Sequence, residues 1–371
     1  MNGGARRRDR RVYALLARCY RTVTAPPRWR GPLPAASLRR VLVVRHDRIG
    51  DAIVTTPLLA FLRAAAPGAE VDVLASPANR AIVAADPNVA RVIVNDHTWR
   101  GWWRALRELR RRDYDLVLSP IFGRGLREGM VAALAGGRRA ARVSVVRPKR
   151  YAGFFSHLVR TPPWAMHMAQ RVLVLGQRAI VAPPELATGG VERWPLRLVP
   201  EDASVERAEA FLDAARVARF VAVNVSAAEW FREWPPEQCA ATIRAVAARH
   251  PDVAFVLTPP PGKSDAAARV VKALAGVRAI VCPPSNDLLD LAALVARAAV
   301  VVTPDTANIH IASAMRRPVV ALYTPLGTPP SLWAPLGVPH RSMMAPPDGP
   351  VGAIAPEAIA RAIDELLRDT A

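Results

Sequence analysis

Short apolar runs alternate along the chain with segments whose apolar residues recur at helical spacing. A run such as RVLVV at residues 40–44 has no polar alternation, which predicts a strand buried on both faces of a parallel sheet. In the first half we predict strands at 40–44, 70–75, 89–94, 116–119 and 142–146. Helices are predicted at 52–65, 78–85, 98–112, 127–135 and 165–175. This alternation indicates a parallel sheet with helices on both faces.

The alternation restarts after residues 181–200, a segment rich in Pro and Gly without a clear period. The second half predicts strands at 220–225, 254–258, 279–282, 299–303 and 319–323. Its helices are predicted at 206–215, 236–249, 264–274, 288–296, 307–315 and 356–367. The sequence therefore predicts an α/β protein with two doubly wound, Rossmann-like domains that face a central cleft.

A chain of 371 residues is long enough for two such domains. We expect a basic amphipathic extension at 1–35, a first Rossmann-like domain at 36–185, a linker at 186–200, a second Rossmann-like domain at 201–350 and a C-terminal helix at 351–371. The apolar face of the C-terminal helix is expected to pack back towards the first domain.

Charge adds a prediction about partners. The chain carries 51 Lys+Arg against 31 Asp+Glu, a net charge of +20, which favours nucleotides, phosphorylated lipids, membrane surfaces or nucleic acids. Residues 1–40 hold eleven arginines and a single acid, Asp9. Apolar residues recur at helical spacing between Val12 and Val23, which favours a helix on an anionic bilayer, although a solvated extension remains the alternative.

The expected location is the cytoplasm, peripheral at the inner face of the bacterial inner membrane. No apolar run approaches the ~20 residues that span a bilayer. The three cysteines are widely separated, which favours a reducing compartment and suggests neither a disulfide framework nor a zinc site. We expect no cofactor and no metal.

Three polar turns follow predicted strands, where doubly wound sheets bind their ligands. The first, residues 45–51, places Asp47 and Asp51 beside Arg45 and Arg48. An aspartate at this position is interpreted equally well as a helix cap or as a general base for an acceptor hydroxyl.

The second turn, residues 226–235, contains Ser226 and Arg232. The Ser226 side chain and nearby backbone amides would hold a phosphate, which the forked guanidinium of Arg232 would neutralise. The alternative is an ordinary loop with aromatic packing, in which Trp234 and Pro235 only introduce a helix.

The third turn, residues 303–306, precedes a short helix. The free N–H groups at a helix N-terminus form an anion site, so we expect a phosphate there. Asp305 and Thr306 would cap the helix, contact a ligand, or both. His310 lies one helical turn after Thr306 on the same face, although a lone histidine is more often structural.

Together the three turns resemble glycosyltransferase family 9, the ADP-heptose:lipopolysaccharide heptosyltransferases. Members have a basic first turn that closes with Gly-Asp, as residues 45–51 do. They have a loop ending in Lys-x-Trp-Pro, which residues 226–235 match with Arg232 in place of Lys. They also have Asp-Thr/Ser-Gly-x-x-His-x-Ala, which residues 305–312 match with Ala307 in place of Gly.

The resemblance covers residues 40 to 367 and implies a GT-B fold, with the acceptor in the first domain and the nucleotide sugar in the second. It implies an inverting, metal-independent transfer of a sugar, heptose from ADP-heptose, to a lipopolysaccharide core or another cell-surface glycan. Asp51 resembles the catalytic base. Donor-binding residues implied are Ser226, Arg232, Asp305, Thr306 and His310, with Asp265 as a weaker ribose contact. Acceptor-binding residues are Arg45 and Arg48, for an anionic glycolipid.

Two other functions stay open. An epimerase-like nucleotide-sugar enzyme on the same scaffold would not need a base at Asp51. A non-enzymatic protein that binds anionic polymers would explain the charge, but the arginines beyond residue 40 are scattered and no nucleic-acid recognition motif is present, so no nucleic-acid partner is expected. A Rossmann dehydrogenase is disfavoured because no G-x-G-x-x-G follows any predicted strand.

Overall fold

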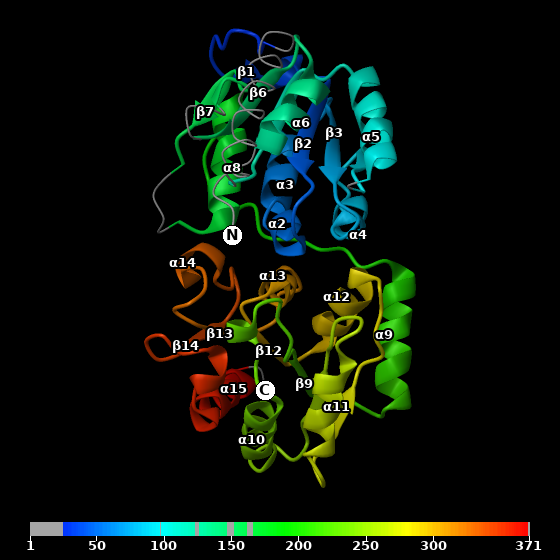
Figure 1. Ribbon diagram of the computed structural model, residues 1–371, viewed down its shortest axis with the longest axis vertical. Coiled ribbons are helices and arrows are strands. Elements are labelled where there is room, and N and C mark those ends of the chain that lie inside the picture. Colours follow the sequence, from blue (N-terminus) through cyan, green and yellow to red (C-terminus); the bar gives the residue numbers. More distant parts are fainter. Residues whose placement is uncertain (1–24, 97, 123–125, 147–151, 162–165, 370–371) are drawn as a thin grey trace, which may run out of the picture. The chain divides into compact units, whose positions relative to one another are not determined.

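The structure is a computed structural model that describes residues 25–96, 98–122, 126–146, 152–161 and 166–369 (Figure 1). The predicted amphipathic helix between Val12 and Val23 lies outside the described residues. The chain divides into two compact units. The first takes the described part of Met1–Pro163 with Met168–Trp194, and the second takes the described part of Trp164–His167 with Pro195–Ala371. The division at residue 195 falls within the expected linker.

The first unit is built on a six-stranded parallel sheet in the order β4-β3-β2-β5-β6-β7. The strands are β2 (Arg40–Arg45), β3 (Glu70–Ala75), β4 (Arg91–Val94), β5 (Leu116–Ser119), β6 (Ala141–Val145) and β7 (His157–Val159). The helices are α2 (Ile49–Ile53), α3 (Thr56–Ala65), α4 (Arg80–Ala84), α5 (Trp99–Arg111), α6 (Leu126–Gly136) and α8 (Met168–Ala179). A short parallel pair joins β1 (Leu33–Pro34) to β8 (Ile180–Val181).

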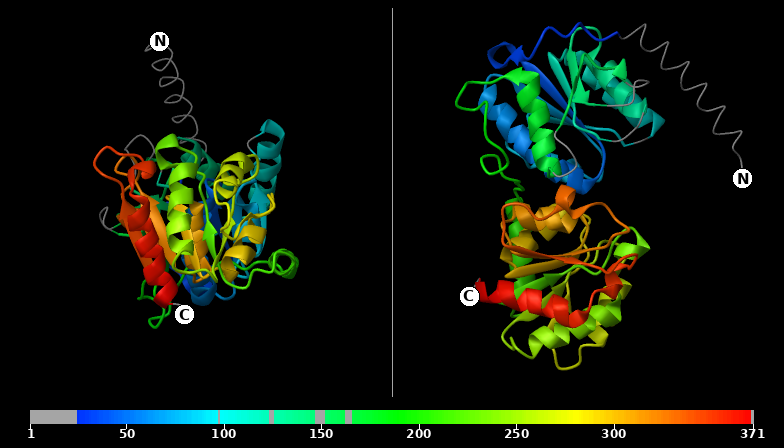
Figure 2. Two further views of the ribbon diagram at one scale, coloured as in Figure 1. Left: turned by 90° about the horizontal axis from the view of Figure 1, so that it is seen from below. Right: turned by 90° about the vertical axis from the view of Figure 1, so that its left-hand side faces the viewer.

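The central strand β2 is buried on both faces of the sheet, which explains why its sequence has no alternation of polar and apolar residues. Successive side chains of a strand point to opposite faces, and Val43 on one face is as fully buried as Leu42 and Val44 on the other. Leu42 and Val44 share a core with α5 and α6, whereas α3 and α8 pack together on the opposite side of the sheet (Figure 2). Gly176 in α8 permits this close packing, because an added Cβ would lie 2.3 Å from Leu58 Cδ1.

The second unit repeats the plan with the strand order β11-β10-β9-β12-β13-β14, again all parallel. The strands are β9 (Phe220–Val223), β10 (Ala254–Leu257), β11 (Ala279–Val281), β12 (Val300–Pro304), β13 (Val319–Tyr323) and β14 (His340–Met344). The helices are α9 (Asp202–Ala214), α10 (Pro236–Ala247), α11 (Ser264–Lys272), α12 (Leu288–Arg297), α13 (Ala307–Ala314), α14 (Pro330–Trp333) and α15 (Pro356–Asp369).

The C-terminal helix α15 lies within the second unit, so the expectation that it packs towards the first domain is wrong. It packs against α10 and beneath β12 and β13, and Figure 2 shows it in red on the face of the sheet opposite α13. Its apolar residues Ile359, Ile363 and Leu367 are completely buried in the core of this unit, which leaves no apolar face for another partner.

In each sheet the first strand is central, and the strand order reverses beside it. The reversal lies between β2 and β5 in the first unit and between β9 and β12 in the second. Doubly wound sheets bind their ligands outside the carboxyl ends of the strands at this point. The prediction of an α/β protein with two Rossmann-like domains is confirmed. The fold also places one candidate ligand site in each unit, at the carboxyl ends of the strands beside the reversal, and we call each of these two sites a half-site.

Candidate functional site

In the first unit the half-site is the turn between β2 and α2, and a buried arginine organises it. Arg45 ends β2 with a fully buried side chain. Its Nε donates to the main-chain oxygen of Asp51 at 2.8 Å, its Nη2 to Asp51 Oδ1 at 3.1 Å, and its Nη1 to the main-chain oxygen of Pro120 at 2.9 Å. Nη1 also lies 3.1 Å from Asp47 Oδ2.

Arg45 therefore holds two carboxylates and ties the end of β2 to the end of β5. Since each of its three guanidinium nitrogens is engaged and none is exposed, it cannot contact an acceptor. This burial argues against the implied acceptor-binding role of Arg45 and favours a role in positioning Asp47 and Asp51. Arg48, by contrast, is exposed at the start of α2.

Asp51 lies in the first turn of α2, three residues after the N-cap residue Arg48, which makes no side-chain cap bond. The helix-cap interpretation of Asp51 therefore does not hold. Its side chain is 23% exposed, and no described residue donates a hydrogen bond to its Oδ2. The carboxylate is thus fixed through one oxygen and open at the other.

Asp47 differs from Asp51 in its electrostatics. Burial raises the pKa of Asp47 to about 6; Arg45 opposes the rise, and the nearby charges of Asp51 and Glu128 add to it. Its Oδ1 is buried, and no residue in the described part of the chain forms a hydrogen bond with it. In the first half-site, Arg45 thus forms ion pairs with both Asp47 and Asp51. Asp47 keeps its proton at mildly acidic pH, where an ordinary aspartate is ionised.

The loop after β3 braces this turn, and sequence reasoning did not identify it. Asn79 Nδ2 donates to the main-chain oxygen of Arg45 at 2.8 Å, and Ser76 Oγ donates to that of Asp47 at 3.0 Å. Asn79 Oδ1 in turn accepts from the Ser76 amide at 2.9 Å. The only signal in the sequence was that these polar residues directly follow a predicted strand.

In the second unit a buried asparagine organises the half-site. Asn224 follows β9, and its Nδ2 lies 3.1 Å from Thr303 Oγ1 and 3.3 Å from Thr306 Oγ1. Its Oδ1 accepts from the Ser226 amide at 3.0 Å. Asn224 therefore connects the turn after β9 with the turn after β12, across the point where the strand order reverses. The predicted residues Ser226 and Thr306 are brought together in this way.

Thr306 is the N-cap of α13, because its Oγ1 accepts from the Asn308 amide at 3.3 Å. The capping interpretation therefore holds, and the amides of the first helical turn lie at the same place. The residue after it, Ala307, stands where the resembling family has Gly. It is not among the residues with positive φ, so this turn does not require glycine.

Arg232 and Asp305, both predicted donor-site residues, form an ion pair. Arg232 Nη2 lies 3.3 Å from Asp305 Oδ2 and donates to Thr328 Oγ1 at 3.2 Å. Thr328 also donates to Asp305 Oδ2 at 3.3 Å. Gly327 lies against the guanidinium, since an added Cβ would be 3.3 Å from Arg232 Nε and Nη2. Burial raises the pKa of Asp305, and Arg232 and Thr328 oppose the rise.

Arg232 is partly accessible. Its side chain is 19% exposed, and its Nε has no hydrogen-bond partner among the described residues. It can therefore bind a further anion, as Arg45 cannot.

His310 is buried in α13 beside two other rings. Its centroid lies 6.2 Å from that of His167 and 5.6 Å from that of Trp333. Burial lowers the pKa of His310 to about 3, and the charge of His167 adds to this; burial also lowers the pKa of His167 to about 4. Both rings are therefore neutral at neutral pH, so His310 carries hydrogen-bonding nitrogens and no positive charge.

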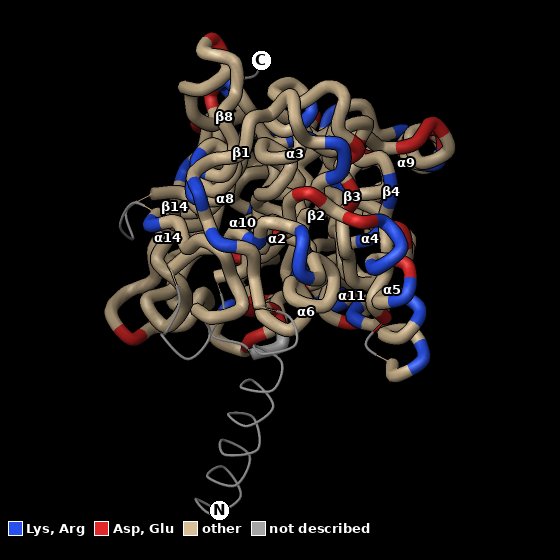
Figure 3. The backbone as a smooth tube through the Cα atoms, turned by 90° about the horizontal axis from the view of Figure 1, so that it is seen from above, with Lys and Arg blue, Asp and Glu red and all other residues tan. Residues whose placement is uncertain are grey.

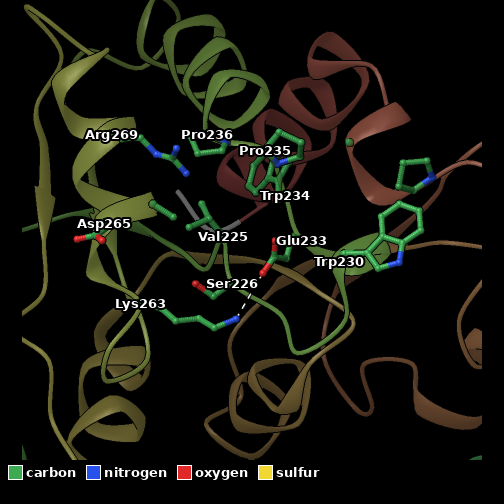
Figure 4. Close-up of a pocket in the computed structure, with 13 residues that line it drawn as sticks. Val225, Ser226, Trp230, Glu233, Trp234, Pro235, Pro236, Lys263, Asp265 and Arg269 are labelled. Carbon is green, nitrogen blue, oxygen red and sulfur yellow. Dashed lines mark hydrogen bonds and ion pairs between the residues drawn. The ribbon is translucent and has the colours of Figure 1, made fainter.

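A pocket of about 530 Å³ opens beside the same turn (Figure 4). Ser226 and the predicted ribose contact Asp265 both line it, together with residues that sequence reasoning did not identify. Those residues include Trp230, Glu233, Lys263 and Arg269. Figure 4 shows Glu233 and Lys263 facing each other beside Ser226; Lys263 Nζ lies 3.4 Å from Glu233 Oε1 and donates to Ala227 O at 2.8 Å.

The Trp-Pro pair that ends this turn is structural. Trp234 is 1% exposed and belongs to the core of the second unit, and Pro235 is the N-cap residue of α10. Gly352 lies so close to Pro235 that an added Cβ would be 2.6 Å from Pro235 Cγ. The turn is thereby fixed at its end, while Ser226 and Arg232 before it line the half-site.

Comparisons with known proteins identify relatives of this chain. The family described as "Glycosyltransferase family 9 (heptosyltransferase)" matches residues 102–347. The chain is 28% identical over 303 residues to "Lipopolysaccharide heptosyltransferase 1" of Pseudomonas aeruginosa, covering 77% of this chain and 79% of the relative.

Two solved structures have the same fold. A glycosyl transferase family 9 protein from Veillonella parvula aligns with a TM-score of 0.77 and 20% identity, over 91% of this chain and 98% of the other. The E. coli "ADP-heptose lps heptosyltransferase II" aligns with a TM-score of 0.73 and 20% identity, over 89% and 99%. Among the helices that the structure describes, none is long and apolar enough to cross a membrane.

Proposed function

Because the chain belongs to glycosyltransferase family 9, the heptosyltransferases, we propose that it transfers heptose from ADP-heptose to a lipopolysaccharide core or another surface glycan, with inversion at the transferred carbon. The observation that carries the proposal is the fixed carboxylate of Asp51 at the carboxyl end of β2. The alternatives of a sugar epimerase and of a non-enzymatic binding protein are set aside, since the family is one of glycosyltransferases.

Asp51 is the proposed general base. Arg45 holds its Oδ1, and its Oδ2 is left for the proton of an acceptor hydroxyl. In the proposed step this hydroxyl oxygen bonds to the anomeric carbon as the bond from that carbon to the diphosphate breaks. A base within hydrogen-bond reach typically contributes 10²–10⁴-fold to such a step. Exposed Arg48, three residues before Asp51, is the proposed contact for an anionic acceptor.

The second half-site is proposed to hold the donor. As the bond breaks, negative charge develops on the departing diphosphate, and fixed donors that face it stabilise the transition state. Arg232, with its unpartnered Nε, and the amides at the start of α13 supply such donors. Ser226, Asp305, Thr306 and His310 are proposed to contact the donor phosphates and sugar, and Asp265 the ribose, because Ser226 and Asp265 line the same pocket.

We further propose that the enzyme works at the inner membrane surface in the cytoplasm, where a lipid-anchored acceptor would be presented. The eleven arginines of residues 1–40 support this placement.

The test is a donor screen with a matched pair of variants. Purified protein is incubated with ADP-heptose, or with UDP- and GDP-sugars, and a lipid-linked glycan extract, and nucleotide release is measured. The proposal expects ADP release from the wild type, and a loss on the order of 10²-fold or more in Asp51→Asn with ADP affinity retained.

Asp47→Asn is the matched control, because it changes the other carboxylate on the same arginine. It should keep a rate within about tenfold of the wild type, since it removes no proton acceptor in the proposed step. Release of UDP or GDP in place of ADP would overturn the donor assignment. Full turnover by Asp51→Asn, or loss only in Asp47→Asn, would overturn the assignment of the base.

A further inference from the structure

Helix α5 presents two exposed tryptophans, which is unusual for a helix at the edge of a sheet. Trp99 is 72% exposed and Trp103 is 46% exposed, and their rings contact each other edge to face with centroids 5.4 Å apart. Neither belongs to the core, which α5 joins through Ala105 and Leu109 on its other side. Exposed apolar rings side by side mark an interaction surface rather than scattered surface residues.

The same side of α5 is strongly basic. Its five exposed arginines, shown blue along the helix in Figure 3, are Arg100, Arg104, Arg107, Arg110 and Arg111. At 3.6 residues per turn, Trp99, Trp103, Arg107 and Arg110 lie within an arc of about 80°.

Acidic groups do not neutralise this face. The single acid of α5, Glu108, pairs with Arg91 at 3.2 Å, and Asp96 pairs with Arg104 at 3.3 Å. None of the remaining four arginines forms an ion pair with a described residue. The α5 face therefore keeps a net positive charge next to its two indole rings.

We propose that the α5 face, formed by Trp99, Trp103 and the five arginines, docks onto an anionic lipid bilayer. Indole rings favour the boundary between lipid headgroups and acyl chains, because one part of the ring is apolar and its N–H remains hydrated. Arginines beside them are attracted by anionic headgroups. Nucleic acid would also attract the arginines, but its phosphates give no reason for a pair of apolar rings that contact each other.

This surface shares no residue with either half-site, and the proposal does not depend on the transfer reaction. Residues 1–24 contain no tryptophan. Tryptophan fluorescence can therefore distinguish docking through α5 from attachment through the N-terminal extension.

The first experiment measures partitioning of the full chain onto phosphatidylcholine vesicles with and without phosphatidylglycerol. Trp99→Ser/Trp103→Ser and Arg107→Ser/Arg110→Ser/Arg111→Ser should each weaken binding to the anionic vesicles by on the order of tenfold or more. The matched control removes three exposed cations on other helices, Arg178→Ser/Lys272→Ser/Arg361→Ser, and should bind like the wild type. Equal losses in the control and the α5 variants would reduce the effect to net charge and overturn the proposal.

The second experiment measures depth with brominated phosphatidylcholine, which quenches tryptophans that reach the acyl chains. The wild type should be quenched, whereas Trp99→Phe/Trp103→Phe should bind with similar affinity and lose most of the quenching, although seven of the nine tryptophans remain. Unchanged quenching in that variant would overturn docking through α5. So would arginine variants that lose binding to a DNA duplex but keep vesicle binding.

Discussion

The partly buried carboxylate of Asp47 predicts an unusual dependence of stability on pH. Its pKa is raised by burial from an ordinary value of 3.8 to about 6, although Arg45 lies beside it. Between these two pKa values the folded protein holds a proton that the unfolded chain has lost. The free energy of unfolding contributed by this group therefore falls as pH rises, by about 1.4 kcal/mol per pH unit.

The magnitude follows from the shift. A rise of about two pKa units corresponds to about 3 kcal/mol, which is fully present below about pH 4 and lost above about pH 6. Asp47→Asn cannot lose a proton, so it does not carry this dependence. The unfolding free energy of Asp47→Asn minus that of the wild type should therefore rise by about 3 kcal/mol between about pH 4 and about pH 8.

The assay is urea unfolding of both proteins across this pH range, with the difference taken at each pH. Titrating groups that do not interact with Asp47 are common to both chains and cancel in the difference. Asp252→Asn, whose side chain is 62% exposed, reports what an exposed Asp-to-Asn change does on its own. A difference between Asp47→Asn and the wild type that stays constant with pH would refute the argument that burial holds a proton on Asp47.

Three further outcomes are expected. Arg232→Lys should weaken ADP binding about tenfold in titration calorimetry, because an ammonium cannot reproduce a forked contact; unchanged affinity would exclude Arg232 from the donor site. Gly176→Ala should lower the unfolding free energy by roughly 1 kcal/mol, because the added Cβ would clash with Leu58. Gly68→Ala should not lower it, because no atom lies within 4 Å of the added Cβ. Equal changes in unfolding free energy for the two variants would contradict this. Deletion of residues 1–24 should weaken binding to anionic vesicles more than turnover on a soluble acceptor, and unaltered sedimentation with vesicles would count against a membrane role for the extension.

The sequence predicted the central strands well because burial on both faces leaves a continuous apolar run. Two of the four edge strands of the six-stranded sheets, β7 and β14, lack that signature. β14 alternates between exposed and half-buried residues along His340–Met344, and β7 is only three residues long, so neither was predicted. The C-terminal helix was predicted with the correct apolar face, but periodicity cannot say which surface covers that face.

The prediction of the half-site residues from the sequence was limited in a similar way. Polar residues after strands were predicted where they broke an apolar run clearly, as Asp51 and Asp305 do. Asn224 was missed because the run FVAVNV was predicted as a strand through residue 225, whereas β9 ends at Val223. The error of two residues hid the side chain that joins the turns after β9 and β12.

The two arginines of the half-sites look alike in sequence, but their burial gives them different roles. Arg45 ends the central strand β2, Arg232 lies in the turn after the central strand β9, and each pairs with an aspartate. All three guanidinium nitrogens of Arg45 donate hydrogen bonds to main-chain or carboxylate oxygens inside the protein. Its charge therefore holds Asp51 in place and is not exposed to a ligand. Arg232 keeps an unpartnered Nε, and its carboxylate partner already has a pKa raised by burial. The raised pKa means that burial disfavours the charged form of Asp305, which weakens its ion pair with Arg232. We therefore expect an added diphosphate to displace Asp305 from Arg232 more readily than any anion displaces Asp51 from Arg45.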